Sequence, residues 1–398
     1  MNGPMRAQPE VKVLAIADDT TGALEVGAQF AMAGVRSLVS TANALLAGTC
    51  ALVLNTETRQ VAPEGAGRRV ARLAGAARDA GIRYLYKKTD STLRGNIASE
   101  LQALLNVFPE RFLVYVPAYP KMGRVVKGGE LYVDGLPLAR TGSAKDPAQT
   151  SREGSIPSLL ARGSRAPVLL ATASGQLESL LRDAAPGSIV VCDGTTEEDL
   201  EAAAAAVALS GRDCLVAGTG GFSGHWIRRL PVERGFARRR PNIKRCLVVS
   251  GSRHPASREQ VQQASDSRIA GICLGENPDT DTATGSAVAA ALAAREWALL
   301  RTPGTGPPGV SERLGAITGR VLASQPVDGR IIFGGSTAFS VLRALSVKVV
   351  QPLGELLAGV AVSVACYRSR DLVLITKAGG FGDAGSLVSI LEHLEKEP

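Results

Sequence analysis

A cluster of charged and hydroxyl side chains occupies residues 87–96, which read Lys-Lys-Thr-Asp-Ser-Thr-Leu-Arg-Gly-Asn. An apolar run predicts a strand before it, and leucines at helical spacing predict a helix after it. Ligands bind at this position in open α/β sheets. Cationic and hydroxyl groups beside a helix N-terminus suit a carboxylate or a phosphate. A helix cap alone would need only Asp90 or Ser91, so we favour a binding site.

Two further strand ends carry charged side chains. Asp18 and Asp19 follow the apolar run at 11–17, and Arg59 follows the run at 51–55. One of the two carboxylates can cap the next helix, which leaves the other for a sugar hydroxyl, a metal ion or a proton. Each feature is a modest signal by itself.

Three glycine-rich loops follow strand-like runs in the C-terminal part of the chain. Glycine lets backbone N–H groups approach phosphate oxygens closely, and a helix start adds a favourable dipole. Three such loops at equivalent positions predict a nucleotide site. The residues expected to contact the nucleotide are Ser252, Gly334, Gly335, Ser336, Thr337, Gly379 and Gly380. Lys377, which precedes the last loop, is expected to neutralise charge in a transition state.

Other common sites do not fit this sequence. No Gly-Lys pair occurs, which excludes a P-loop. Two prolines interrupt the GxGxxG match at 304–309, and the acidic partner of a dinucleotide fingerprint is missing. The histidines at 225, 254 and 393 lack zinc-ligand spacing.

The 398 residues exceed one ordinary core, and strand–loop–helix units recur along them. We therefore predict an α/β protein with two domains, each a mainly parallel sheet covered by helices, and an interdomain active-site cleft. The predicted domains are residues 11–235, which carry the 87–96 cluster, and residues 244–395, which carry the nucleotide loops. Residues 1–10 are expected to be disordered.

The net charge of +8 is concentrated in one segment. Residues 228–245 hold eight basic side chains against Glu233, and they match no nucleic-acid motif. We interpret the segment as a solvated linker and expect no nucleic-acid partner. No apolar run approaches the roughly 20 residues of a membrane span. The six cysteines are interpreted as reduced core residues, and the protein as cytoplasmic.

These motifs resemble those of the four-carbon acid sugar kinase family over nearly the whole chain. The similarity is carried by the ADDxTGA-like run at 17–23, the 87–96 cluster, the Val-Pro-Ala-aromatic-Pro segment at 116–120 and the loops at 251–252 and 377–382. The resemblance implies that the domain at 11–235 binds a sugar acid and that the domain at 244–395 binds a nucleotide. It also implies ATP-dependent phosphorylation of the terminal hydroxyl of threonate, erythronate or an oxidised derivative. One departure is Ser336, which stands where the family usually has aspartate.

The roles predicted from the residues and the resemblance are as follows. The catalytic candidates are Asp90, Asp18, Asp19 and Lys377, and which carboxylate acts as the base stays open. The substrate-binding candidates are Asp18, Arg59, Lys88, Asp90, Ser91, Thr92, Arg94, Gly95 and Asn96. ATP and Mg²⁺ are the expected cofactors, the metal ligands are unknown, and a homodimer is a candidate assembly. The alternatives are a non-catalytic sugar-acid sensor and an NAD(P)-dependent oxidoreductase.

Overall fold

The computed structural model describes residues 11–42, 44–141, 154–172, 174–237, 242–252, 254–267, 269–303 and 309–395. The expectations for residues 1–10, for the glycine–proline match at 304–308 and for the arginines at 238–240 fall outside these ranges. The chain divides into two compact units, Met1–Phe236 and Ala237–Pro398. No helix in the described ranges combines the length and apolar character that crossing a bilayer requires.

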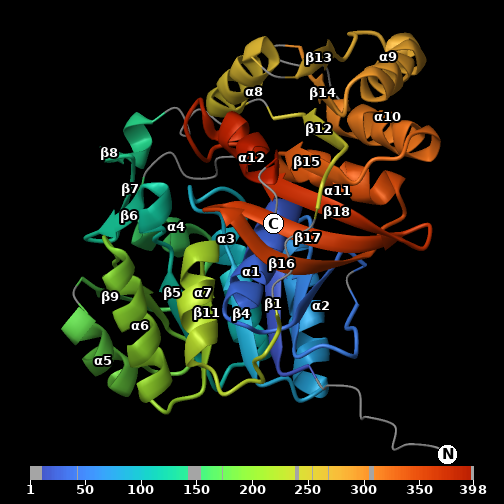
Figure 1. The fold of residues 1–398 in the computed structure, drawn as a ribbon. Helices are drawn as coiled ribbons and strands as arrows, with labels where there is room; N and C mark the ends of the chain where they lie inside the picture. The colour runs from blue at the N-terminus through green and yellow to red at the C-terminus, as the bar shows by residue number, and fades with distance from the viewer. Residues whose placement is uncertain are drawn as a thin grey trace, which may run out of the picture. The chain divides into compact units, whose positions relative to one another are not determined.

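The first unit is built on a parallel sheet with strand order β2-β3-β1-β4-β11-β5-β10-β9 (Figure 1). Its strands are β1 (Val13–Ala17), β2 (Ser37–Ser40), β3 (Ala51–Asn55), β4 (Tyr84–Lys88), β5 (Phe112–Val116), β9 (Val168–Ala171), β10 (Ile189–Cys192) and β11 (Cys214–Gly218). Strands β1, β3 and β5 are buried along their whole length, because helices cover both faces of the sheet.

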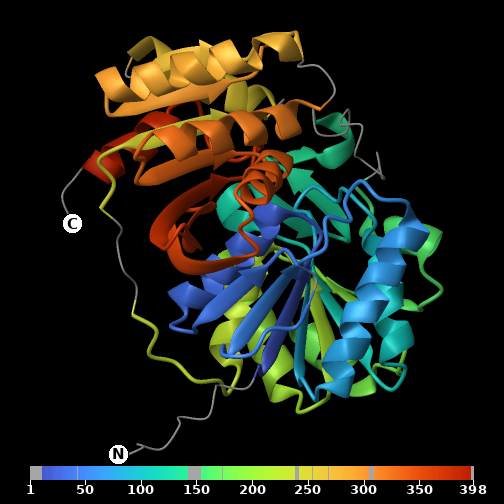
Figure 2. The same cartoon turned by 90° about the vertical axis from the view of Figure 1, so that its right-hand side faces the viewer.

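Helices cover the two faces of this sheet (Figure 2). One group packs side by side as α1 (Thr20–Met32), α7 (Gly220–Arg229), α6 (Glu197–Leu209) and α5 (Ser174–Asp183). The other group is α2 (Pro63–Asp79), α3 (Ile97–Val107) and α4 (Ile156–Gly163). The helix after β1 belongs to the first group and the helix after β4 to the second. β1 and β4 are neighbours, so their carboxyl ends form a topological switch point, where ligands bind in such sheets.

A small antiparallel sheet follows β5 and the proline-containing segment at 116–120. It consists of β6 (Arg124–Lys127), β7 (Glu130–Val133) and β8 (Leu136–Pro137), with short 3-10 turns η1 (Pro120–Met122) and η2 (Leu138–Arg140) at its ends. This sheet fixes the segment that continues from the carboxyl end of β5.

The second unit has a parallel core with strand order β13-β14-β12-β15-β18, extended by antiparallel β17 and β16. Its strands are β12 (Cys246–Ser250), β13 (Ala270–Cys273), β14 (Trp297–Arg301), β15 (Gly329–Phe333), β16 (Val349–Leu357), β17 (Val360–Tyr367) and β18 (Arg370–Lys377). Helices α8 (Pro255–Ser267) and α12 (Ser386–Glu395) pack together, and a second group contains α9 (Asp281–Ala294), α10 (Val310–Ser324) and α11 (Gly335–Ala344). A further 3-10 turn, η4 (Pro278–Thr280), precedes α9.

The α/β class and the mainly parallel sheets are confirmed, while two smaller expectations need correction. Three of the six cysteines are buried (Cys50, Cys192 and Cys246) and Cys214 is partly buried, but Cys273 and Cys366 are exposed. Cys273 lies on the edge strand β13, and Cys366 lies beside the turn that joins β17 to β18. The basic segment is not wholly solvated. The Arg234 guanidinium donates to the carbonyls of Ile227 (3.3 Å), Arg228 (2.8 Å) and Leu230 (3.0 Å), and so closes the end of α7.

Candidate functional site

Arg59 lies at the centre of an ion-pair network at the switch point. Its Nε donates to Asp18 Oδ2 (2.7 Å) and its Nη2 to Asp18 Oδ1 (3.1 Å), a paired geometry that suits a guanidinium and a carboxylate. Its Nη1 donates to Asp19 Oδ2 (3.0 Å), and its Nη2 lies 3.4 Å from Asp90 Oδ2. Burial opposes the charge of Arg59, but the three carboxylates outweigh burial and raise its pKa well above the usual value. One arginine therefore joins the ends of β1, β3 and β4.

Asp90 holds the turn between β4 and α3. Its Oδ1 accepts from the Thr92 backbone N–H (3.0 Å) and hydroxyl (2.7 Å) and from Arg94 Nε (2.9 Å), while Oδ2 accepts from Arg94 Nη2 (2.7 Å). Burial disfavours the carboxylate, but Arg94 and Arg59 outweigh it and hold the pKa of Asp90 well below its usual range. Asp90 therefore stays ionised near neutral pH, so it orients groups and is a weak proton acceptor.

The turn also depends on a glycine with unusual backbone geometry. Gly95 has φ +85°, in the left-handed region that favours glycine. A Cβ there would lie 3.3 Å from Arg59 Cγ and 3.4 Å from Asp18 Oδ2. Gly95 therefore lets the 90–96 turn approach the arginine network. Ser91 is buried in the same turn.

Asp19 is both a helix cap and a member of the network. Its Oδ1 accepts from the Gly22 N–H (2.9 Å), and its Oδ2 accepts from the Thr21 hydroxyl (2.7 Å). Burial works against the charge, but Arg59 and Lys88 lower the pKa of Asp19 overall. The sequence left open which of the two aspartates is the cap, and the structure assigns this role to Asp19.

Lys88 faces a carboxylate that the sequence analysis did not single out. Its Nζ lies 3.5 Å from Glu25 Oε2 and donates to the Thr89 carbonyl (2.9 Å). Glu25 is buried on α1, and burial raises its pKa although Lys88 opposes the shift. Glu25 lies six residues after Asp19, a spacing that does not place two side chains on one helix face, so no local pattern singles out Glu25.

Lys87 and Asn96 make contacts that stabilise the fold around the site. Lys87 Nζ pairs with Glu100 on α3 at 2.9 Å, and both side chains are fully buried. The Asn96 amide donates to the carbonyls of Thr58 (2.9 Å) and Val61 (2.7 Å) and so fixes the loop that carries Arg59. A substrate role for Asn96 stays a prediction.

A second polar group lies beside Asp19, at the end of β3. Glu57 Oε1 accepts from the Thr20 hydroxyl (2.7 Å) and the Asn55 amide (2.8 Å). Burial raises the pKa of Glu57, while the Asn55 hydrogen bond lowers it. Glu57 has φ +48°, a strained value for a residue with a Cβ, so this turn is held by its surroundings.

The predicted nucleotide loops of the second unit meet at the carboxyl ends of β12, β15 and β18. A Cβ on Gly379 would clash with the Ser252 hydroxyl, and a Cβ on Gly251 would clash with the Thr337 hydroxyl. The Gly334 N–H donates to the Lys377 carbonyl (3.1 Å). The remaining predicted contacts of this group, Gly335 and Ser336 in the first turn of α11 and Gly380 after β18, belong to the same loops. The glycines are thus needed for close approach between loops.

Lys377 is buried at the end of β18. Its Nζ donates to the Ala378 carbonyl (3.1 Å) and lies 4.9 Å from the centre of the Phe333 ring. The ring face stabilises the ammonium charge. A catalytic role for Lys377 stays a prediction.

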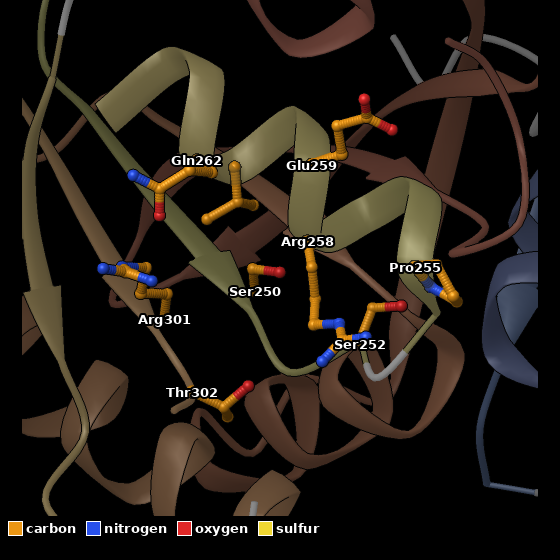
Figure 3. Close-up of a pocket in the computed structure, with 9 residues that line it drawn as sticks. Ser250, Ser252, Pro255, Arg258, Glu259, Gln262, Arg301 and Thr302 are labelled. Atoms are coloured by element: carbon orange, nitrogen blue, oxygen red, sulfur yellow. The ribbon is translucent and has the colours of Figure 1, made fainter. Parts of the chain in front are cut away.

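A cavity of about 370 Å³ adjoins the Ser252 loop (Figure 3). Arg258 projects from α8 toward Ser252, and Arg301 lies at the end of β14, in register with Ser250. The lining residues are Ser250, Ser252, Pro255, Arg258, Glu259, Val261, Gln262, Arg301 and Thr302. In Figure 3 the Glu259 carboxylate points away from both arginines, which leaves this cavity with a cationic side. Neither arginine could be singled out from the sequence, because single cations on a helix and at a strand end are ordinary.

In the described residues, no group of three or more histidine, cysteine or acidic side chains is arranged to hold a metal ion. Magnesium in phosphoryl-transfer sites is bound largely by phosphates and water, with one or two protein carboxylates.

Two family models match the chain. One, described as a sugar-binding N-terminal domain, matches residues 13–226, and the other, a nucleotide-binding C-terminal domain, matches residues 247–387. A D-threonate kinase from Bordetella bronchiseptica is 31% identical over 96% of this chain and 97% of its own length. A D-erythronate kinase from Heliobacterium modesticaldum is 32% identical over 63% of this chain and 59% of its own length. A 3-oxo-tetronate kinase from Methylobacterium radiotolerans is 26% identical over 93% of this chain and 96% of its own length.

Solved structures agree on the fold. A structure from Salmonella typhimurium LT2 has a TM-score of 0.78 at 20% identity and covers 96% of this chain and 98% of that one. A Bordetella bronchiseptica protein, solved as a domain-swapped dimer with bound citrate, has a TM-score of 0.50 at 28% identity. The match covers 96% of this chain and 98% of that protein.

Proposed function

Because this chain belongs to the four-carbon acid sugar kinase family and is therefore a phosphotransferase, we propose that it uses ATP to phosphorylate the terminal hydroxyl of a four-carbon sugar acid. The first unit would bind the acid and the second unit the nucleotide. The observation that carries the proposal is the network in which Arg59 joins Asp18, Asp19 and Asp90 at the switch point.

D-threonate is the first candidate substrate. D-threonate kinases from Bordetella bronchiseptica and Salmonella typhimurium are 31% and 30% identical to this chain over nearly its whole length. The 3-oxo-tetronate kinase from Methylobacterium radiotolerans is 26% identical over a comparable span. A D-erythronate kinase is 32% identical over 63% of this chain, so D-erythronate and 3-oxo-tetronate are the next candidates.

The carboxylates would act mainly by orienting the substrate hydroxyls. Asp90 and Asp19 have lowered pKa values and stay ionised, so they accept hydrogen bonds without taking up a proton readily. Phosphoryl transfer passes through a loose transition state in which positioning and charge neutralisation provide most of the rate. A carboxylate that only aims the hydroxyl at the γ-phosphate is sufficient for this chemistry.

The second unit would bind ATP on its three glycine loops. Ser252 belongs both to these loops and to the cavity with Arg258 and Arg301, so a polyphosphate on the loops would lie near two guanidinium groups. Mg²⁺ would be held mostly by the phosphates, and Ser336 offers a hydroxyl there. Lys377 would neutralise charge near the last loop. The cleft that would bring the two ligands together stays a prediction, as does a homodimer.

A screen of ADP release over D-threonate, D-erythronate and 3-oxo-tetronate with Mg²⁺-ATP tests the proposal. We expect one acid to stimulate ADP release strongly, and ³¹P NMR of the product to show a phosphate ester on the terminal carbon. Equal ADP release with and without every acid would refute the kinase assignment. Calorimetry with Mg²⁺-ATP separates the sensor alternative raised by Ser336, because a sensor would bind the acid and give no nucleotide heat.

A further inference from the structure

Every carboxylate oxygen of the three aspartates at the switch point already accepts a hydrogen bond. Both oxygens of Asp18 accept from Arg59, and both oxygens of Asp19 and of Asp90 accept from groups on their own turns. The pKa values of Asp19 and Asp90 are also lowered. These acids can orient a substrate hydroxyl. When that hydroxyl attacks a phosphate, however, its proton has to leave, and a carboxylate of low pKa accepts it poorly.

Glu57 lies two residues before Arg59 and has one carboxylate oxygen without a partner. Its Oε1 accepts from the Thr20 hydroxyl (2.7 Å) and the Asn55 amide (2.8 Å), which fixes the side chain beside the first residue of α1. Its Oε2 has no hydrogen-bond or ion-pair partner in the described part of the chain, and it reaches solvent. A carboxylate that is fixed through one oxygen and open at the other is arranged to receive a group from outside the protein.

The backbone of Glu57 also distinguishes this position. Its φ of +48° lies in the left-handed region, which is unfavourable for a residue with a Cβ. The turn is held from two sides, because Asn55 Oδ1 accepts from the Glu57 N–H (3.2 Å) and Arg69 on α2 donates to the Thr56 carbonyl (2.9 Å). Glycine or asparagine would fit this backbone with less strain, so the carboxylate explains a glutamate here better than the turn does.

The charged groups around Glu57 come from three elements. Asp19 is adjacent to Thr20 at the start of α1, Arg59 follows in the same loop, and the Arg69 guanidinium on α2 lies 3.5 Å from the Glu57 carbonyl oxygen. Burial raises the pKa of Glu57 and Asp19 adds to this shift, while Arg59 and the two hydrogen bonds to Oε1 oppose it. The pKa of Glu57 is raised overall, which makes it a better proton acceptor than Asp19.

We propose that Glu57 is a catalytic base, whose Oε2 accepts the proton of the substrate hydroxyl that attacks ATP. This inference rests on the proposed function. The hydroxyl O–H bond breaks and its proton moves to Oε2, while the oxygen forms a bond to the γ-phosphorus. The bond between that phosphorus and the β,γ-bridging oxygen breaks, and its electron pair leaves with ADP. Glu57 returns the proton to water after the phosphorylated acid has left.

The test is Glu57→Gln, assayed with Mg²⁺-ATP and the best acid of the screen over about pH 5 to 9. The amide keeps an oxygen for Thr20 and Asn55 but does not take up a proton. We expect kcat to fall roughly 100-fold, the lower end for a catalytic base because the transition state is loose. The KM values for the acid and for ATP should stay within about twofold of wild type.

The pH profile separates a base from a residue that only shapes the turn. Wild-type kcat/KM should fall toward acid pH as Glu57 becomes protonated. In Glu57→Gln this acid limb should move to lower pH, where the aspartates become protonated. Glu57→Asp keeps an ionisable group on a shorter side chain, so it should keep the acid limb with a reduced kcat.

Asp134→Asn is the matched control. Asp134 is also an acid with a left-handed backbone (φ +51°), but its side chain is 72% exposed and it lies in the turn between β7 and β8. This variant should keep the wild-type kcat and acid limb. If Glu57→Gln keeps the wild-type kcat, or loses turnover with an unchanged acid limb, the inference is wrong. If Glu57→Gln does not fold, Glu57→Asp decides, and a wild-type kcat for that variant overturns the inference. If wild type phosphorylates no acid, the proposed function itself fails.

Discussion

Replacing Asp90 by asparagine probes the point where the two arginines of the site meet. The amide keeps an oxygen for Thr92 but turns an N–H₂ group or a neutral oxygen toward Arg94 and Arg59. Removing one partner of a buried ion pair costs about 3–5 kcal/mol. Arg59 keeps Asp18 and Asp19, and the Arg94 side chain is 28% exposed. We therefore expect a smaller loss of unfolding free energy, about 2 kcal/mol.

The catalytic loss should be larger than the loss of stability. Without the Asp90 charge the 90–94 turn and Arg59 shift, and a displacement of about 1 Å in a positioned site can reduce rates on the order of 100-fold. We expect turnover of the sugar acid to be abolished or reduced by at least this factor, while Mg²⁺-ATP binds with nearly wild-type affinity. Coupled ADP release measures the first quantity and calorimetry the second.

Asp213→Asn is the control, because Asp213 also pairs with an arginine at 2.8 Å but lies at the amino end of β11. It should leave both quantities unchanged. If Asp90→Asn weakened sugar-acid turnover and ATP binding equally, the assignment of separate ligands to the two units would be refuted.

Three further predictions concern other parts of the chain. Lys87→Gln leaves Glu100 buried without its cation, so urea unfolding should show that the free energy of unfolding falls by about 3–5 kcal/mol. The double variant Lys87→Met with Glu100→Leu should recover part of this loss, and an unchanged unfolding midpoint for Lys87→Gln would refute the prediction. Gly379→Ala places a Cβ against the neighbouring loop and should weaken ATP binding measured by calorimetry without changing sugar-acid binding; equal affinity for ATP would contradict the predicted loop contact. A hydrogen bond from His225 lowers the pKa of Glu201, so the ionised Glu201 stabilises the fold fully above its unfolded-state pKa, and this contribution is lost as pH falls through the folded-state pKa. Glu201→Gln should therefore flatten the acid side of a plot of melting temperature against pH, and parallel plots for variant and wild type would count against this prediction.

The parallel core could be predicted because its signal is local. Continuous apolar runs followed by polar strand ends are characteristic of strands buried on both faces. The antiparallel β16 and β17 were missed for a physical reason. The turn from β17 to β18 places Arg368 and Ser369 at φ +50° and +61°, where hairpins usually carry Asn-Gly. Tertiary pairing imposes this turn without the usual sequence signal.

The location of the candidate site could also be predicted, but the pairing of its side chains could not. Strand alternation explains why Lys87 and Lys88 have different partners. Lys87 and Lys88 are neighbours in β4, so their side chains point to opposite faces. Lys87 pairs with Glu100 on α3, and Lys88 lies near Glu25 on α1. Which acid each lysine meets depends on helices that pack from distant parts of the chain, and no local pattern specifies this.

The balance of charge at the switch point links these observations. A count of cations in the sequence indicates an anion site, yet in the structure Arg59, Lys88 and Arg94 each face acidic side chains of the protein. Such paired cations organise the carboxylates, and the low pKa of Asp90 follows from this pairing. We therefore assign the orientation of the substrate hydroxyls to the network around Arg59.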